Sequence, residues 1–124
     1  MIGDSYFFDT YAIIEVVKGN PNYSRFSEKT IVTSINNVVE VYYHYLKEFN
    51  EEMANEIINS IEFVLVDISI NTAVKSCIFR YKYKKRKMSY IDCIGYVAAI
   101  NNNLLFLTGD KEFEDLEGVE FVKK

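Results

Sequence analysis

The chain has 124 residues, the size of one domain, and 49% of them are hydrophobic, so one ordinary core can form. Its net charge of −4 disfavours unspecific electrostatic binding to nucleic acid. No run approaches the roughly 18 consecutive apolar residues that a membrane span needs, and an N-terminus containing Asp4 and Asp9 lacks a secretory signal pattern. We therefore expect a single cytoplasmic domain over residues 1–124 that does not enter a membrane.

Short apolar runs alternate with segments of helical periodicity along the whole chain. The predicted strands cover residues 5–8, 30–33, 62–66, 104–107 and 119–122. The predicted helices cover residues 11–17, 36–49, 51–59, 69–83 and 89–101. Gly19 ends the first of these helices, and Ser69 and Ser89 are candidate caps of the last two. This order predicts an α/β fold, a three-layer α/β/α sandwich around a mostly parallel sheet of four to five strands.

Four acidic residues fall where such a fold gathers its ligands. Asp9 and Asp110 follow the first and fourth predicted strands, and Glu40 and Asp92 lie in or near the first turns of two predicted helices. Binding sites of open α/β sheets lie outside the carboxyl ends of the strands. Four carboxylates that converge there repel one another unless a cation is present. Oxygen ligands suit Mg²⁺ or Mn²⁺, and one or two such ions can promote phosphodiester hydrolysis.

Each acid also has a purely structural explanation when it is considered alone. Asp9 can cap the following helix, and Glu40 can be a solvated residue on a helix face. Asp92 can interact favourably with a helix dipole, and Asp110 can form an Asx turn. The interpretation as a metal site depends on all four acids meeting at one edge of the sheet.

The segments around these acids resemble the motifs of a known family. They are Phe8-Asp9-Thr10, Thr33-Ser34-Ile35-Asn36-Asn37-Val38-Val39-Glu40-Val41, Ser89-Tyr90-Ile91-Asp92-Cys93-Ile94-Gly95-Tyr96-Val97-Ala98-Ala99 and Leu107-Thr108-Gly109-Asp110-Lys111-Glu112-Phe113. Their order and spacing resemble the PIN-domain nucleases, and among them the VapC-like toxins of toxin–antitoxin pairs. Asn37 stands where the family frequently has Thr, which keeps a polar group there.

The resemblance covers the chain as a single PIN-like domain and implies an endoribonuclease that depends on one or two Mg²⁺ or Mn²⁺ ions. It assigns catalysis and metal binding to Asp9, Glu40, Asp92 and Asp110. It makes Thr10, Asn37 and Thr108 supporting polar groups, and Glu112 a reserve ligand that is more simply a surface glutamate. It also implies an RNA substrate, a homodimer and a small antitoxin partner.

A basic run follows the fourth predicted helix. Its cations are Lys82, Lys84, Lys85, Arg86 and Lys87. They can flank the acidic groove and contact RNA phosphates, or they can be the solvated carboxyl end of a helix. His44, one turn beyond Glu40, is predicted to be a packing residue. Cys77 and Cys93 are predicted to be buried thiols.

Two other functions remain open from the residues alone. Asp67 follows the third predicted strand, as the phospho-acceptor of a receiver domain does, although the acidic pair and the final helix of a receiver are missing. The chain can also be a non-catalytic member of the nuclease fold that binds RNA or protein. In the interpretation as a nuclease, Asp67 is a cap or turn residue before the next helix.

Overall fold

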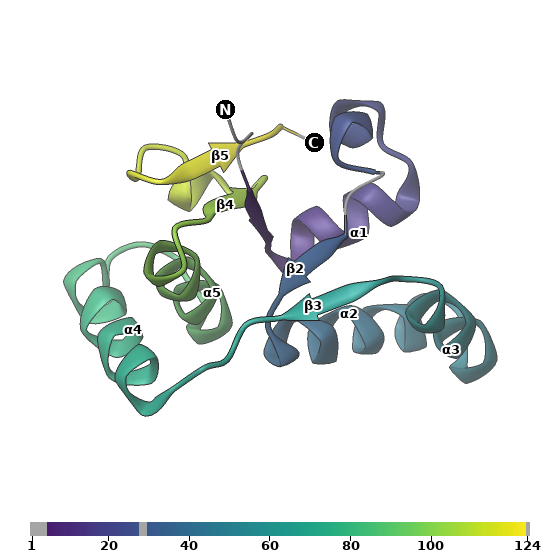
Figure 1. Ribbon diagram of the computed structural model, residues 1–124, viewed down its shortest axis with the longest axis horizontal. Helices are drawn as coiled ribbons and strands as arrows, with labels where there is room; N and C mark the ends of the chain where they lie inside the picture. Colours follow the sequence, from purple (N-terminus) through teal and green to yellow (C-terminus); the bar gives the residue numbers. More distant parts are fainter. Residues whose placement is uncertain (1–4, 28–29, 124) are drawn as a thin grey trace.

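The structure, a computed structural model, describes residues 5–27 and 30–123 (Figure 1). Its strands are β1 (Tyr6–Phe8), β2 (Ile31–Thr33), β3 (Phe63–Leu65), β4 (Leu105–Thr108) and β5 (Val119–Phe121). Backbone hydrogen bonds order three of them as β1-β4-β5 and pair β2 with β3, and each of these pairs is parallel. The predicted parallel α/β fold is therefore confirmed, with its five strands divided into groups of three and two.

A side chain links the two groups of strands. The hydroxyl of Thr33, the last residue of β2, donates a hydrogen bond of 2.7 Å to the carbonyl oxygen of Phe8, the last residue of β1. Both residues are buried. The carboxyl ends of β1 and β2 are therefore held side by side, and the residues that follow them begin at the same edge of the sheet.

The helices are α1 (Thr10–Lys18), α2 (Ile35–Glu48), α3 (Glu51–Asn59), α4 (Ile70–Lys82) and α5 (Tyr90–Asn101). Ser69 and Ser89 cap α4 and α5 as predicted, each accepting a backbone N–H. Gly19 ends α1 with φ of 82°, a conformation that favours glycine. The short 3₁₀ helices η1 (Pro21–Phe26) and η2 (Lys111–Phe113) were not predicted. In η1, Pro21 occupies the first helical position, where proline is favoured.

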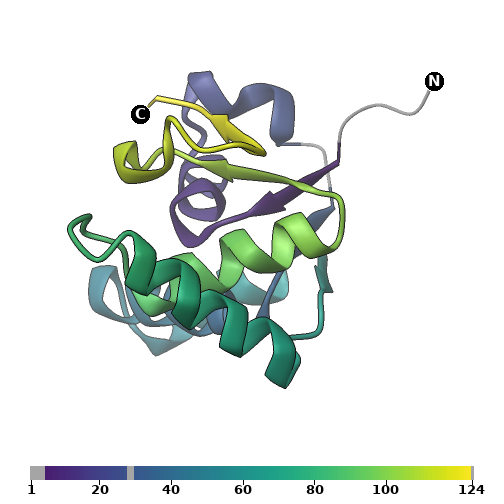
Figure 2. The same cartoon turned by 90° about the vertical axis from the view of Figure 1, so that its left-hand side faces the viewer.

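Consecutive strand residues face opposite layers, which is the source of the three-layer arrangement. Phe8 and Leu107 belong to a core that includes Ala12 and Ile13 of α1. Their neighbours in the strands, Phe7 and Phe106, belong to a second core with α5. Figure 2 shows α4 lying against the outer side of α5. The sheet therefore separates two hydrophobic cores, and its carboxyl edge is open to the residues that follow β1 and β4.

The apolar side of α4 is turned away from the core. Ile70 is 84% exposed, Ile78 64% and Tyr81 71%. The side toward α5 carries small polar residues instead, and the buried Ser76 hydroxyl donates to the Thr72 carbonyl oxygen. The periodicity thus identified which residues share one side of the helix, but not which side α5 covers.

The same orientation corrects the prediction for the cysteines. Cys93 is buried in α5, whereas Cys77 is exposed on α4, and both thiols are free.

Within the described part of the chain, no helix combines the length and apolarity that crossing a bilayer requires.

Candidate active site

Asp9 lies at the point where β1 ends and α1 begins. Its Oδ1 accepts a hydrogen bond of 2.7 Å from the backbone N–H of Ala12, so Asp9 is the N-cap of α1. Its Oδ2 accepts a hydrogen bond from the hydroxyl of Thr108, the last residue of the neighbouring strand β4. The residue is only 2% exposed. The predicted cap role and the predicted support by Thr108 are thus two parts of one buried arrangement.

Asp110 is held beside Asp9 by the same threonine. The Asp110 backbone N–H donates to Thr108 Oγ1 at 3.0 Å. The carboxylate of Asp110 caps η2 by accepting from the Glu112 backbone N–H at 2.9 Å. Glu112 therefore contributes its main chain to the position of Asp110.

Asp92 approaches from the first turn of α5. It forms a capping box with Ser89, in which the Asp92 N–H donates to Ser89 Oγ at 3.0 Å. Its own Oδ2 accepts from the Ser89 N–H at 3.4 Å. Because an ionised carboxylate has about four lone-pair positions, helix capping leaves acceptor capacity on Asp92 and on Asp110.

Glu40 is brought to the site by a chain of polar side chains. Thr10 Oγ1 donates to Glu40 Oε1 at 2.5 Å, and Asn37 Nδ2 donates to Thr10 Oγ1 at 3.1 Å. Ser34 Oγ donates to Asn37 Oδ1 at 2.6 Å. The fully buried Asn37 thus makes the hydrogen bond expected from the residue usual at this position. Ser34 was missing from the predicted site, although its place three residues before Asn37 at a helix N-cap was the available signal.

The charges of the four acids interact. Burial raises the pKa of Asp9 to about 8, and the charges of Asp92 and Asp110 raise it further against the lowering effect of its hydrogen bonds. Burial also raises the pKa of Asp92, and the charges of Asp110 and Glu40 contribute. Among the described residues, the ion pairs do not involve any of the four acids. The site therefore concentrates negative charge without a paired cation.

An open groove runs along these residues. Asp9, Asp92 and Asp110 line it together with Thr10, Tyr11 and Lys111. Within residues 5–27 and 30–123, no three His, Cys, Asp or Glu side chains already stand close enough to hold one ion. Repulsion between unpaired carboxylates favours that separation. The donor set nevertheless fits a hard divalent cation, because it consists of oxygen atoms that form no ion pair within the described residues.

The basic run divides into one engaged residue and four exposed ones. Arg86 forms two hydrogen bonds with the Asp115 carboxylate, at 2.7 and 3.0 Å, and donates to the Glu112 carbonyl oxygen at 2.7 Å. It thereby fastens the turn after α4 to η2, close in sequence to Asp110. Lys82, Lys84, Lys85 and Lys87 are exposed, and their contact with RNA stays a prediction.

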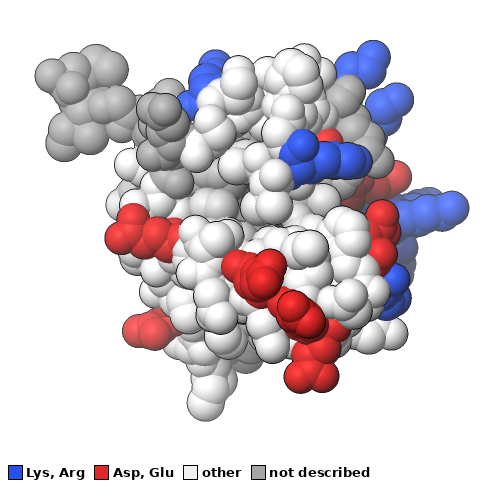
Figure 3. Space-filling model, turned by 90° about the vertical axis from the view of Figure 1, so that its right-hand side faces the viewer, with Lys and Arg blue, Asp and Glu red and all other residues white. Residues whose placement is uncertain are grey.

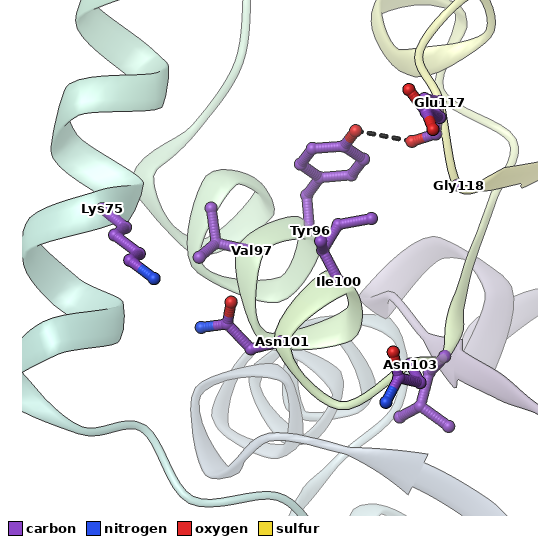
Figure 4. A pocket seen from close by; sticks show the side chains of 9 residues that line it. Lys75, Tyr96, Val97, Ile100, Asn101, Asn103, Glu117 and Gly118 are labelled. Atoms are coloured by element: carbon purple, nitrogen blue, oxygen red, sulfur yellow. Dashed lines mark hydrogen bonds between the residues drawn. The ribbon is translucent and has the colours of Figure 1, made fainter.

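The remaining candidates lie elsewhere. Asp67 is exposed in the loop before α4, and His44 packs against Tyr45 with ring centroids 5.0 Å apart. A further hollow, between α4, α5 and the segment before β5, is drawn in Figure 4. There the Tyr96 hydroxyl donates to the Glu117 carbonyl oxygen. Because Asn103 and Leu104 line this hollow just before β4 begins, it lies at the amino edge of the sheet, away from the acids.

Comparison with known proteins agrees with the order of these motifs. The profile of the PIN domain matches residues 6–119. The chain belongs to the PIN domain family. No curated protein sequence matches this PIN domain.

Solved structures share its fold. A toxin–antitoxin complex from Klebsiella pneumoniae contains a chain with 24% identity and a TM-score of 0.74, over 94% of this PIN domain and 96% of that chain. VapC20 of Mycobacterium tuberculosis, described as a toxin that cleaves the sarcin–ricin loop, has 14% identity and a TM-score of 0.76. The match covers 95% of this PIN domain and 99% of the VapC20 chain. A chain of VapBC2 from Rickettsia felis, bound to a promoter DNA fragment, has 16% identity and a TM-score of 0.72. The match covers 95% of this PIN domain and 97% of that chain.

The pKa of Asp9 predicts how the metal-free PIN domain responds to pH. The Asp9 carboxyl has an ordinary pKa of 3.8 and a folded pKa of about 8, so between these values the folded protein retains a proton that the unfolded chain has released. Its contribution to the free energy of unfolding is therefore full below about pH 4 and is lost as pH rises toward 8.

Urea denaturation in EDTA at a series of pH values measures this effect. Between pH 4 and 8, the free energy of unfolding of Asp9→Asn should change less with pH than that of the wild type. Parallel curves for the two proteins would contradict the burial of this carboxyl without a counter-charge.

Proposed function

We propose that this PIN domain is an endoribonuclease that depends on divalent metal ions and is the toxin of a toxin–antitoxin pair. The observation that carries the proposal is that Asp9, Asp92 and Asp110 line one groove and Glu40 is hydrogen-bonded to Thr10 of the same groove. Burial and mutual repulsion raise the pKa values of Asp9 and Asp92 there. A surplus of negative charge at such an edge favours a cation and, with it, a phosphodiester. The toxin descriptions of two of the similar structures support the same biological role.

In this proposal Asp9, Glu40, Asp92 and Asp110 hold one or two Mg²⁺ or Mn²⁺ ions. When bound, the metal supplies positive charge for the phosphate and a more acidic water. Thr108 fixes Asp9 and Asp110 relative to each other, and Thr10 fixes Glu40. Since Asp9 is protonated near neutral pH without metal, its loading releases a proton.

Cleavage of a fluorescent oligoribonucleotide in Mn²⁺ tests the proposal. Asp9→Asn and Asp92→Asn should each reduce the cleavage rate by about 100-fold or more, the usual effect of removing an electrostatic group from a reacting centre. The matched control is Asp67→Asn at an exposed position, which should cleave like the wild type. RNA binding without cleavage by pure wild-type protein in Mg²⁺ and Mn²⁺ would support a non-catalytic binding module instead.

We propose that the exposed lysines after α4 contact RNA phosphates. Replacing Lys84, Lys85 and Lys87 with Ser should weaken binding of catalytically inactive Asp92→Asn protein. It should also reduce the slope of log K against log salt by about one for each lysine that binds a phosphate. Salt-dependent fluorescence anisotropy measures both quantities. An unchanged slope would contradict a role of these lysines in binding.

Arg86 provides the contrasting variant. Because its guanidinium binds Asp115 and the Glu112 carbonyl oxygen, Arg86→Ser should lower thermal stability, which the triple lysine variant should not do.

The exposed side of α4 supports a homodimer. Ile70, Val74, Ile78 and Tyr81 follow one another along this side, with the exposed Cys77 near its middle. An antiparallel pair of α4 helices places Val74 opposite Ile78 of the second copy. It also brings Asp67, which precedes α4, toward Lys82 at the carboxyl end of the other α4. We propose a second copy of the chain as the occupant of this side and a small antitoxin as the other protein partner.

Size-exclusion chromatography with light scattering tests the dimer. Ile78→Asp should convert a wild-type dimer into a monomer, whereas Glu56→Gln at an exposed position of α3 should not. A short bis-maleimide should link two wild-type copies through Cys77, and Cys77→Ser should abolish the link. Wild-type protein that is monomeric at micromolar concentration would refute the pairing.

A further inference from the structure

A pocket of about 630 Å³ lies between α1, α2 and α3. Its size is within the range of small-molecule sites, and its lining combines aromatic and apolar side chains with a few polar groups. The lining residues that matter here are Tyr11, Ile14, Glu15, Glu48, Tyr45 and Phe49. Its lining does not include Asp9, Glu40, Asp92 or Asp110.

Two buried polar groups face this pocket. Tyr45 is 5% exposed, and its hydroxyl has no hydrogen-bond partner within the described ranges. Burial, with a contribution from the charge of Glu15, raises the pKa of Tyr45 to about 12. Glu15 is 3% exposed, and its carboxylate accepts a hydrogen bond of 2.7 Å from Asn20 Nδ2. A buried hydroxyl without a partner is unfavourable unless a ligand supplies one.

The pocket adjoins the acidic groove. Tyr11 and Ile14 line both. Asp9 caps α1, and Glu15 lies about 9 Å further along the same helix. Tyr11 also lies against Gly109, where an added Cβ would be 2.3 Å from the Tyr11 ring, and Gly109 immediately precedes Asp110. A nucleotide with its phosphate at the acids can therefore place a neighbouring base in this pocket.

We propose that the pocket binds a guanine base of the RNA substrate, an inference that rests on the proposed nuclease function for the source of the base. The Watson–Crick edge of guanine carries N–H donors, which match the Glu15 carboxylate, beside the O6 acceptor, which matches the Tyr45 hydroxyl. Tyr11 and Phe49 offer aromatic surfaces for stacking. Adenine presents a ring acceptor in place of the N1–H donor, so its N1 lone pair would oppose the carboxylate.

The charges around the pocket favour a neutral base over a phosphate. Glu15 and Glu48 line it, and Lys18 is its one cation in the described part of the chain. On the face drawn in Figure 3, acidic side chains gather at the middle and below, and the cations lie above them and toward the right-hand edge. Glu15 forms an ion pair with Lys18 at 3.8 Å. An arginine from a protein partner can bind Glu15 in addition, but a guanidinium has donors only and would leave the Tyr45 hydroxyl hydrogen without an acceptor.

Binding of neutral nucleosides, measured by NMR titration in EDTA, tests the pocket separately from catalysis. Guanosine and inosine, which share N1–H and O6, should bind the wild-type protein. Adenosine should bind at least about tenfold more weakly than guanosine, in line with the discrimination of a paired hydrogen-bond contact. Argininamide serves as the probe for the alternative occupant and should not displace guanosine.

Variants of the two polar groups assign the contacts. Glu15→Gln should weaken guanosine binding about tenfold. Tyr45→Phe should weaken it severalfold while Tm stays the same or rises, because the hydroxyl that it removes has no partner in the free protein. The matched control is Tyr42→Phe on the same helix, whose hydroxyl donates to Asn55 Oδ1 outside the pocket and which should bind guanosine normally.

Asp9→Asn separates this inference from the proposed function. It should lose cleavage and retain guanosine binding, so the pocket can stand if the nuclease assay fails. Equal affinity for adenosine and guanosine, displacement by argininamide, or normal guanosine binding by Tyr45→Phe would each overturn the guanine assignment. Because Tyr45→Phe removes one unpartnered atom, it keeps the test decisive even where Glu15→Gln fails to fold.

Discussion

The buried carboxylate of Asp9 is the constraint on which the site depends. It joins three elements at once, since it ends β1, caps α1 and accepts the hydroxyl of Thr108 at the end of β4. A charged group in that position is unfavourable without a partner cation, and the raised pKa of Asp9 expresses this cost. The parallel pairing of β1 with β4 then determines that Asp110 lies at the same edge.

Hydroxyl and amide side chains determine where α2 and Glu40 lie relative to Asp9. Thr33 holds the end of β2 against Phe8, so α2 begins beside α1. The hydrogen bonds from Ser34 through Asn37 and Thr10 then hold Glu40 beside Thr10, which lines the groove. These bonds join elements that are far apart in the sequence. Neutral side chains thus position Asp9 and Glu40, whereas helix capping positions Asp92 and Asp110.

Much of this arrangement could be predicted from the sequence, and the exceptions have physical reasons. Asp9 and Asp110 follow apolar strand runs, and a parallel sheet brings such positions to one edge. The order of the motifs then indicated the family. The orientation of α4 could not be predicted, because periodicity does not say that Thr72 and Ser76, rather than Ile70 and Ile78, face α5. The structural role of Arg86, which binds Asp115, could not be predicted either, because Asp115 is distant in sequence.

The most direct test of the account is a thermal melt of the purified protein during Mn²⁺ titration, compared with Asp9→Asn and Asp92→Asn. A cation that binds only the folded state stabilises it by an amount that grows with the ratio of its concentration to Kd. The account predicts that Tm of the wild type rises with Mn²⁺ and that the rise is abolished in both variants. An equal rise in all three proteins, or none in the wild type with Mn²⁺ or Mg²⁺, would contradict a metal site built on these acids.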